Sequence, residues 1–248
     1  MSFYITEDVK KINFYDADFK KRASISAVMN FFSETAIKQS EELGASLDYL
    51  VENNIMWFLI KWNFNIKRLP ELNEVVTIRT WPFNMVKFHA YRQFEMIDKN
   101  DDRIITADSL WLLIDSSRRR PIRIPDDIFD FYRVDKNNDS VLIIDDLVEP
   151  NTHHFENRFQ VRISDLDSNN HVTHSKYGEW AIDTIPMDIF TNFNIKKLTI
   201  LYEKETDYGN EIVSFSEKIE DGNRITFNHR IQTSGNEKLV LLKTVWEK

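Results

Sequence analysis

Residues 161–180 read VRISDLDSNNHVTHSKYGEW, and they join a predicted strand over 156–163 to a predicted helix over about 172–185. Asp, Ser and Asn are common in turns and at helix N-termini, so composition alone predicts an ordinary polar turn here. The spacing predicts more, because Asp167, Asn169 and His171 alternate and would point the same way from an extended or loop-like segment. We therefore expect a carboxylate, a carboxamide and an imidazole to share one face at this junction.

The remainder of the chain is organised as two halves with the same order of elements: a strand, a helix and four strands. The helix of the first half covers 25–43, with Ser24 as its N-cap and Gly44 after its end. The strand-like runs are rich in β-branched and aromatic residues. They cover 3–15, 56–68, 75–81, 87–98 and 104–115 in the first half, and 156–163, 195–204, 211–220, 223–233 and 237–247 in the second; residues 100–102 supply a hairpin turn.

Three ordered matches indicate that the halves are repeats. They pair residues 16–18 with 165–167, residues 73–76 with 210–213, and Trp111 with Trp246, at offsets of 149, 137 and 135 residues. The shift between the first two offsets predicts about 12 extra residues after the first helix, around 45–54.

The repeat predicts the fold class. One long helix packed on a curved antiparallel sheet, twice in one chain, is a tandem α+β arrangement. We expect an N-terminal unit over 1–115, a connector over 116–152 that crosses the outside of the molecule, and a C-terminal unit over 153–248.

Composition excludes several classes of protein. The 248 residues include no cysteine, which rules out disulfides, thiolate metal sites and a cysteine nucleophile. The formal charge of −8 argues against bulk binding of nucleic acid. The five glycines are not spaced for a phosphate-binding loop or a nucleophile elbow. We therefore expect neither a cofactor nor a metal.

The chain has no run approaching the roughly 18 apolar residues that a membrane helix needs. Its first residues resemble neither a secretory signal nor an organelle transit peptide. A cytoplasmic protein without a membrane span is the expectation.

Residues 161–180 also resemble a block of the plant and bacterial acyl-acyl carrier protein (acyl-ACP) thioesterases, in which SDLD-x-N-x-HV-N-N-x-x-Y is followed by Trp. The D-x-N-x-H piece is shared with other hot-dog-fold thioesterases, but further blocks of the chain are also similar to the family. The resemblance implies a double hot-dog fold, which agrees with the repeat. The similar blocks are 23–36, 54–57, 80–81, 107–111 and 118–125.

The family carries a functional Glu after the second helix, often followed by Cys, and residues 202–206 match that block with Glu205 and Thr206. A Cys–His–Asn mechanism therefore cannot operate in this chain. The resemblance implies hydrolysis of a fatty acyl-ACP thioester, with water activated by carboxylate and His171, and with Asn169 polarising the carbonyl. The choice of carboxylate stays open between Asp167 and Glu205, as does the choice between a carboxylate that accepts the proton of water and one that attacks the thioester directly as a nucleophile. His174 stands where the family often has Asn; it could tune the site or cap the helix, and we expect the cap.

The first half lacks the D-x-N-x-H set, because Phe-Lys-Lys-Arg follows its Asp16–Asp18. By resemblance it is the non-catalytic half that shapes the acyl-chain pocket. Ordinary core packing is the alternative for each pocket candidate. The candidates are Met56, Trp57, Phe58, Trp81, Phe88 and Trp111.

The family-level partner, acyl carrier protein, is acidic, and so is this chain. A local run of four arginines without an acid could steer such a partner, although a solvated connector explains the run equally well. The tandem arrangement permits a monomer and does not exclude a homodimer. The arginines are Arg118, Arg119, Arg120 and Arg123.

Three other functions remain open on the sequence. An acyl-coenzyme A thioesterase would use the same site, and a non-enzymatic sensor would bind acyl thioesters without turnover. A hydratase on this fold has a pattern resembling D-x-N-P-x-H, and no proline lies inside the present block.

Overall fold

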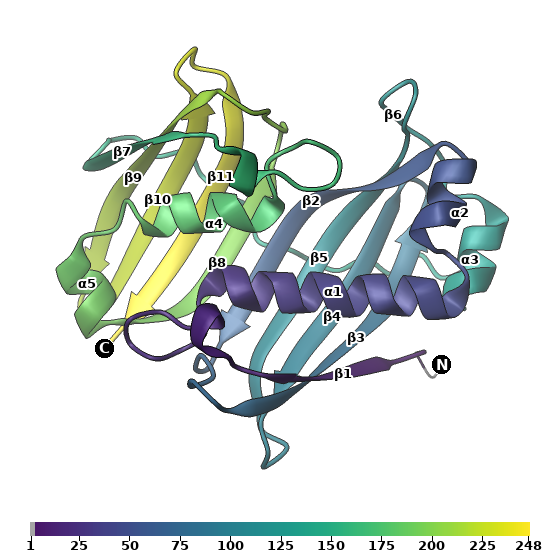
Figure 1. The fold of residues 1–248 in the computed structure, drawn as a ribbon, viewed down its shortest axis with the longest axis horizontal. Helices are drawn as coiled ribbons and strands as arrows, with labels where there is room; N and C mark the ends of the chain where they lie inside the picture. The colour runs from purple at the N-terminus through teal and green to yellow at the C-terminus, as the bar shows by residue number, and fades with distance from the viewer. Residues whose placement is uncertain (1–2) are drawn as a thin grey trace.

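The structure, a computed structural model, describes residues 3–248, so the first two residues of the predicted 1–115 unit lie outside it. One sheet of 11 strands runs through the molecule (Figure 1), in the order β1-β3-β4-β5-β2-β8-β11-β10-β9-β7, with β6 paired to β5. Every pairing is antiparallel. Helices α1 and α4 cross the same face of this sheet (Figure 1), which confirms the predicted tandem α+β class.

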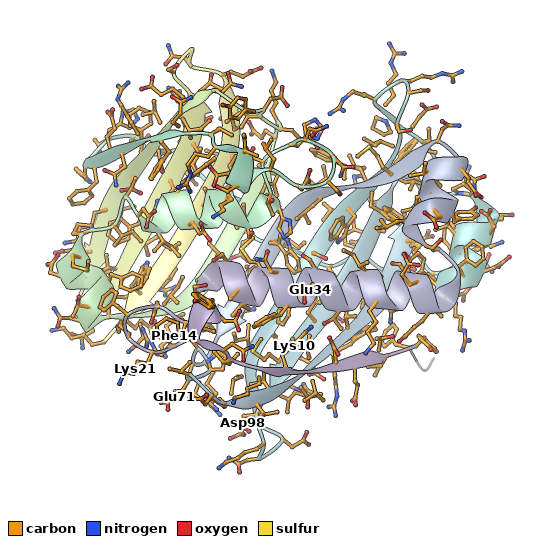
Figure 2. All side chains as sticks on the ribbon, in the orientation of Figure 1. Lys10, Phe14, Lys21, Glu34, Glu71 and Asp98 are labelled. Atoms are coloured by element: carbon orange, nitrogen blue, oxygen red, sulfur yellow. The ribbon has the colours of Figure 1, made fainter. Side chains whose placement is uncertain are left out.

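The first half closely follows its predicted elements. Ser24 Oγ accepts a hydrogen bond from Ala27 N (3.2 Å) and Gly44 has a φ of +90°, so both helix boundaries are confirmed. Lys10 of β1 pairs with Glu34 of α1 (3.0 Å), and Figure 2 labels both. The elements are β1 Thr6–Lys11, η1 Phe14–Asp16, α1 Ile25–Leu43, α2 Leu47–Glu52, β2 Ile55–Ile66, β3 Val75–Val86, β4 His89–Ile97, β5 Arg103–Asp115, β6 Arg120–Pro121 and α3 Asp126–Tyr132.

The second half repeats this order with a shorter main helix. Its elements are β7 Phe155–Gln160, η2 Ile163–Asp165, α4 His174–Ile182, α5 Met187–Asn192, β8 Asn194–Tyr202, β9 Glu211–Asp221, β10 Arg224–Thr233 and β11 Lys238–Glu247. Helix α1 has 19 residues and α4 has nine, and each is followed by a six-residue helix, α2 or α5. The expectation of extra residues around 45–54 is therefore wrong, since most of the added length lies within α1.

Equivalent hydrogen bonds in the two halves, from the backbone in one case and from side chains in the other, confirm two of the three repeat matches. Ser24 N donates to Asp16 O (2.8 Å), and Thr173 N donates to Asp165 O (2.9 Å). The indole nitrogens of the two matched tryptophans donate to the hydroxyl two residues earlier on their own strands, at Ser109 and Thr244.

The remaining match is wrong by one residue. Ile12 N donates to Glu74 O, and its counterpart Val161 N donates to Asn210 O, so Glu74 corresponds to Asn210 rather than to Glu211. Both segments contain Asn-Glu, at 73–74 and at 210–211, but the two pairs do not occupy equivalent positions in the strands. In a strand a slip of one residue exchanges the buried and exposed faces, and the buried pattern follows the corrected offset.

Strands β2 and β8 join the halves at the centre of the sheet. Asn63 lies opposite Thr199, whose Oγ1 donates to Asn63 Oδ1 (2.9 Å). The two residues hold equivalent positions in the repeat, so an approximate twofold axis passes through this pair. It relates the C-terminal end of β2 to the C-terminal end of β8.

The core consists of two apolar clusters. The larger runs beneath α1 and α4 through both halves and includes Phe32, Trp62 and Trp180. The smaller lies beneath α2 and receives Ile128, Phe129 and Tyr132 from α3. Part of the predicted connector thus packs on the first half. In the later part of this segment, Ile144 O accepts a hydrogen bond from Lys61 Nζ of β2 (3.3 Å).

Within residues 3–248, no helix combines the length and the apolar composition needed to span a membrane.

Candidate functional site

The loop between η2 and α4 is held together by the carboxylate of Asp167. Its Oδ1 accepts hydrogen bonds from the backbone nitrogens of Asn169 (2.8 Å) and His171 (3.3 Å), and Asn170 takes a φ of +64°. The loop closes where Asp167 N donates to His171 O (2.8 Å). The carboxylate of Asp167 therefore turns toward its own loop, and the alternating spacing does not aim it along with the other two side chains.

Asp165 anchors the start of this loop. It is 1% exposed and accepts from the backbone and guanidinium of Arg162. Burial alone would raise the pKa of Asp165, but the hydrogen bonds from Arg162 hold that pKa below its ordinary value. A charged, fully bonded carboxylate thus fixes the position from which the loop departs.

His171 and Glu205 meet in one pocket. His171 Nε2 lies 3.5 Å from Glu205 Oε2 and 3.9 Å from Asp207 Oδ1. Glu205 belongs to the segment after β8, so the end of a strand and the loop before α4 converge as the sequence predicted. The guanidinium of Arg119 also pairs with Glu205 Oε2.

The pocket has a volume of about 410 Å³ and has walls from both halves of the chain. Phe58 of β2 and Arg119 come from the first half, and the other lining residues come from the second. In Figure 1 the loop before α4 lies at the end of that helix nearest β2. The lining residues are Phe58, Arg119, His171, Glu203, Lys204, Glu205 and Asp207.

Tyr177 of α4 supports this site from within the core. It is 3% exposed and packs edge-on against Trp180 and Tyr202, with ring centroids 5.4 and 6.0 Å away. Burial, with the negative charge of Glu205, raises the pKa of Tyr177 above its ordinary value. Its hydroxyl therefore stays protonated at neutral pH.

Two residues that differ from the family pattern have structural roles. Thr206, in the position where relatives often carry Cys, is 4% exposed and accepts a hydrogen bond from Asn210 Nδ2 (3.1 Å). His174 is the first residue of α4 and not its cap, which is Thr173. The imidazole of His174 instead reaches Ser33 Oγ on α1 (3.1 Å), and burial lowers its pKa to about 4. The capping prediction is wrong because the ring points toward the neighbouring helix.

The first half contains the same loop without the site. Asp18 Oδ1 accepts from the backbone nitrogens of Lys20 (2.8 Å) and Arg22 (3.2 Å), as Asp167 does from Asn169 and His171. Both basic side chains cross to the other half, where Lys20 Nζ donates to three carbonyls at the end of α5 and Arg22 donates to Asn194 Oδ1 (2.6 Å). This loop serves the contact between the halves.

The six aromatic and methionine pocket candidates lie in different parts of the first half, and Phe58 is the one of them that lines the pocket with His171. Trp57 and Trp111 lie on the α1 side of the sheet, in contact with the smaller core cluster. Trp81 lies on the opposite side, where its indole nitrogen donates to Gln93 Oε1 (3.2 Å), and Met56 alternates away from Trp57. Phe88 is 40% exposed in the turn between β3 and β4.

The arginine run is also divided. Arg119 reaches the pocket, whereas Arg118, Arg120 and Arg123 are exposed on the surface. The sequence named Phe58 as a candidate for the acyl-chain pocket and Arg119 as a candidate carrier contact, and both line the pocket beside His171. It did not single out Asp207, which no motif marks and which enters the pocket two residues after Glu205.

Among the described residues, no group of three His, Asp or Glu side chains is arranged to hold a metal ion. The pocket brings a carboxylate and an imidazole into contact, with a guanidinium beside them.

Comparisons with known proteins show which family this chain resembles in sequence. A model of the acyl-ACP thioesterase N-terminal domain matches residues 5–132, and a model of the acyl-ACP thioesterase C-terminal domain matches residues 148–248. A chloroplastic acyl-[acyl-carrier-protein] hydrolase of Cuphea viscosissima is 25% identical over 250 residues, covering 95% of this chain and 60% of the relative. The chain thus spans about 60% of the length of this curated relative.

Two solved structures share the fold across nearly their whole length. A Lactobacillus plantarum protein described as an oleoyl thioesterase has a TM-score of 0.91 at 22% identity, covering 99% of this chain and 97% of the other. The 12:0-ACP thioesterase from Umbellularia californica has a TM-score of 0.86 at 21% identity, covering 98% and 94%. These likenesses establish the double hot-dog fold. Since the two domain models together match most of the sequence, the chain belongs to the acyl-ACP thioesterase family.

Proposed function

We propose that this chain hydrolyses the thioester of fatty acyl-acyl carrier protein, releasing free fatty acid and so ending chain elongation. Family membership supports the reaction class. The observation that carries the proposal for this chain is the contact between His171 Nε2 and Glu205 Oε2 (3.5 Å), in a pocket of about 410 Å³ between the two halves. A carboxylate in contact with an imidazole can move a proton to and from a reacting group.

The proposed reaction uses water as the nucleophile. Glu205 takes a proton from a water molecule as the water oxygen attacks the thioester carbonyl carbon. The tetrahedral intermediate then collapses, the carbon–sulfur bond breaks, and the proton passes through His171 to the departing sulfur. The products are a carboxylic acid and a free thiol, and the chain returns to its starting protonation state.

Asn169 and Asp167 have different proposed roles. The side chain of Asn169 is exposed on the loop, two residues before His171, and is not among the residues that line the pocket. Its proposed role is to donate to the carbonyl oxygen on which negative charge develops when substrate lies against this loop. Asp167 already binds two backbone nitrogens of that loop, which supports a positioning role. Of the two carboxylates that the sequence left open, Glu205 is the proposed base.

The proposed acyl-chain pocket lies in the first half. Trp57 and Trp111 are the members of the predicted set that face the side of the sheet covered by α1. The names of two structural relatives specify oleoyl and 12:0 chains for those proteins. A panel of chain lengths is therefore needed to define the preference of this chain.

The test is release of free thiol from acyl-ACP and acyl-coenzyme A substrates that carry the same acyl chains. Faster turnover of the carrier-linked series supports the proposal. Preference for the coenzyme series would instead assign acyl-coenzyme A hydrolysis to this site, and binding without thiol release would identify a sensor.

The exposed Arg118, Arg120 and Arg123 are proposed to attract the acidic carrier protein. The cytoplasmic location and the oligomeric state stay predictions.

A further inference from the structure

Arg119 is carried on a turn whose shape is fixed by Asp115, the last residue of β5. Asp115 Oδ1 accepts from the backbone nitrogens of Ser117 (3.0 Å) and Arg118 (2.8 Å). Arg119 N donates to Asp115 O (2.8 Å), and Arg120 of β6 pairs back with Asp115. The turn therefore presents Arg119 at a defined place beside the pocket.

The backbone of Arg119 adopts a conformation that arginine does not favour. Its φ is +50°, in the left-handed region, where a residue with a Cβ costs about 1–2 kcal/mol and glycine has no such cost. The side chain of Arg119 is 56% exposed, so its ion pair contributes little to folding stability. The presence of arginine at position 119 is therefore not explained by its backbone conformation or by a contribution to folding stability. Its contact with Glu205 in the pocket does explain it.

That contact is made on the oxygen proposed to do the chemistry. The guanidinium of Arg119 binds Oε2 of Glu205, and the same Oε2 lies 3.5 Å from His171 Nε2. Glu205 follows the end of β8, in a segment outside the sheet. A charge-assisted hydrogen bond from a fixed turn limits the rotation of this carboxylate and keeps Oε2 facing the imidazole.

We propose that Arg119 is a positioning residue, supplied by the non-catalytic half, that holds the Glu205 carboxylate in its reactive orientation. This inference rests on the proposed hydrolysis. If Arg119 has this role, the site is complete only when the two halves are joined. Arg119 then differs in function from Arg118, Arg120 and Arg123, which are proposed to contact the carrier.

The substitution Arg119→Gly tests the proposal with little risk to folding, because glycine adopts a positive φ without steric cost. The matched control is Arg133→Gly, another exposed arginine with a positive φ (+55°), whose guanidinium lies over Tyr4 and outside the pocket. We expect Arg119→Gly to keep the melting temperature of the wild type and to lower kcat about 10- to 100-fold on carrier-linked and coenzyme-linked substrates alike. The control keeps wild-type kcat.

A double-mutant cycle with Glu205→Gln shows whether Arg119 acts through Glu205. In the Glu205→Gln background, Arg119→Gly should change kcat less than about twofold, because the group it positions is already disabled. Guanidinium ion should partly restore Arg119→Gly and leave Glu205→Gln unaffected.

Two results would overturn the inference while leaving the proposed function in place. One is wild-type kcat in Arg119→Gly. The other is a rise in KM confined to carrier-linked substrates, which would assign Arg119 to docking. Absence of thiol release by the wild type would instead overturn the proposed function itself, and the inference with it.

Discussion

At the scale of single residues, Asp167 and Glu205, the two carboxylates considered as the base from the sequence, make different contacts in the structure. Asp167 binds the backbone of its own loop, and Glu205 faces His171. The duplicated chain provides an internal comparison, because Asp18 makes the same two hydrogen bonds in a half without a D-x-N-x-H set. Asp18 shapes its loop although that loop carries no D-x-N-x-H set. We infer that Asp167, which makes the same hydrogen bonds, also serves to hold its loop in shape.

Substitution of Asp167 distinguishes holding the loop from accepting a proton. Asp167→Asn keeps an oxygen that accepts from both backbone nitrogens, so we expect activity within about tenfold of the wild type; Asp167→Ala should lose about 100-fold as Asn169 and His171 shift. Steady-state thiol release measures the activity of both variants.

Asp18→Ala is the control for the structural effect. It should lower the free energy of unfolding by about 1.5–3 kcal/mol, as Asp167→Ala does. Equal losses for Asp167→Asn and Asp167→Ala would instead make Asp167 the base.

The sequence predicted which residues belong to the site better than it predicted their orientation. His171 and Glu205 do meet in the structure. The assumption that alternate residues point the same way failed at Asp167, because Asn170 is left-handed and the loop is a closed turn rather than an extended strand. The contact of Arg119 with Glu205 could not be predicted, since it joins segments 86 residues apart.

At the scale of elements, long periodic segments were predicted well and short ones were missed. The limits of α1 and of most strands agree with the sequence within a few residues, because their apolar spacing continues over several turns or pleats. Helices α2, α3 and α5 have six or seven residues, too few to show a helical period. Packing against the cores, rather than propensity, stabilises helices of this length.

Strand β10 contains a buried histidine that links folding stability to pH. His229 is fully buried, its Nε2 lies 3.0 Å from Thr244 Oγ1, and burial lowers its pKa to about 3. The equivalent position in β4 is Phe94, since each lies four residues after the partner of a matched tryptophan. The first half thus shows that this core position accepts an aromatic ring without a titrating group.

We expect His229→Phe to weaken the loss of stability in acid. In the unfolded chain the imidazole gains a proton as pH falls below about 6.5, but in the folded chain it stays neutral until about pH 3, so the free energy of unfolding decreases over that range. Between pH 7 and pH 5 the contribution of His229 is about 2 kcal/mol. Urea unfolding at both pH values should show a drop smaller by this amount in His229→Phe. His229→Gln, which retains a hydrogen-bonding group, should show the same reduction, and an unchanged drop in both variants would contradict the buried neutral state.

At the scale of the whole molecule, the net charge of −8 opposes an acidic partner, and the surface arginines after β5 offer a local exception. We expect reversal of Arg118, Arg120 and Arg123 to glutamate to raise KM for acyl-ACP about tenfold at low salt, because the variant surface repels the carrier. The effect should shrink as salt is added, and KM for acyl-coenzyme A should change less. Kinetics at two salt concentrations measure this, and equal KM values for variant and wild type on acyl-ACP would show that the arginines are only a solvated surface.

The repeat is the property of the whole molecule that decides where the site lies. Duplication alone would give two related sites about the axis at Asn63 and Thr199. In one of them Lys20 and Arg22 replace Asn169 and His171 and bind the opposite half, so the proposed catalytic pocket lies only at the loop of the second half among the described residues.

The central claim is that Glu205, in contact with His171, activates water for attack on an acyl-ACP thioester. The most direct test is the rate of thiol release from a saturating fatty acyl-ACP substrate by the wild type and by Glu205→Gln. We expect turnover by the wild type and a loss of roughly 10²- to 10⁴-fold in the variant, with its fold and melting temperature retained. Turnover by Glu205→Gln at the wild-type rate would contradict it.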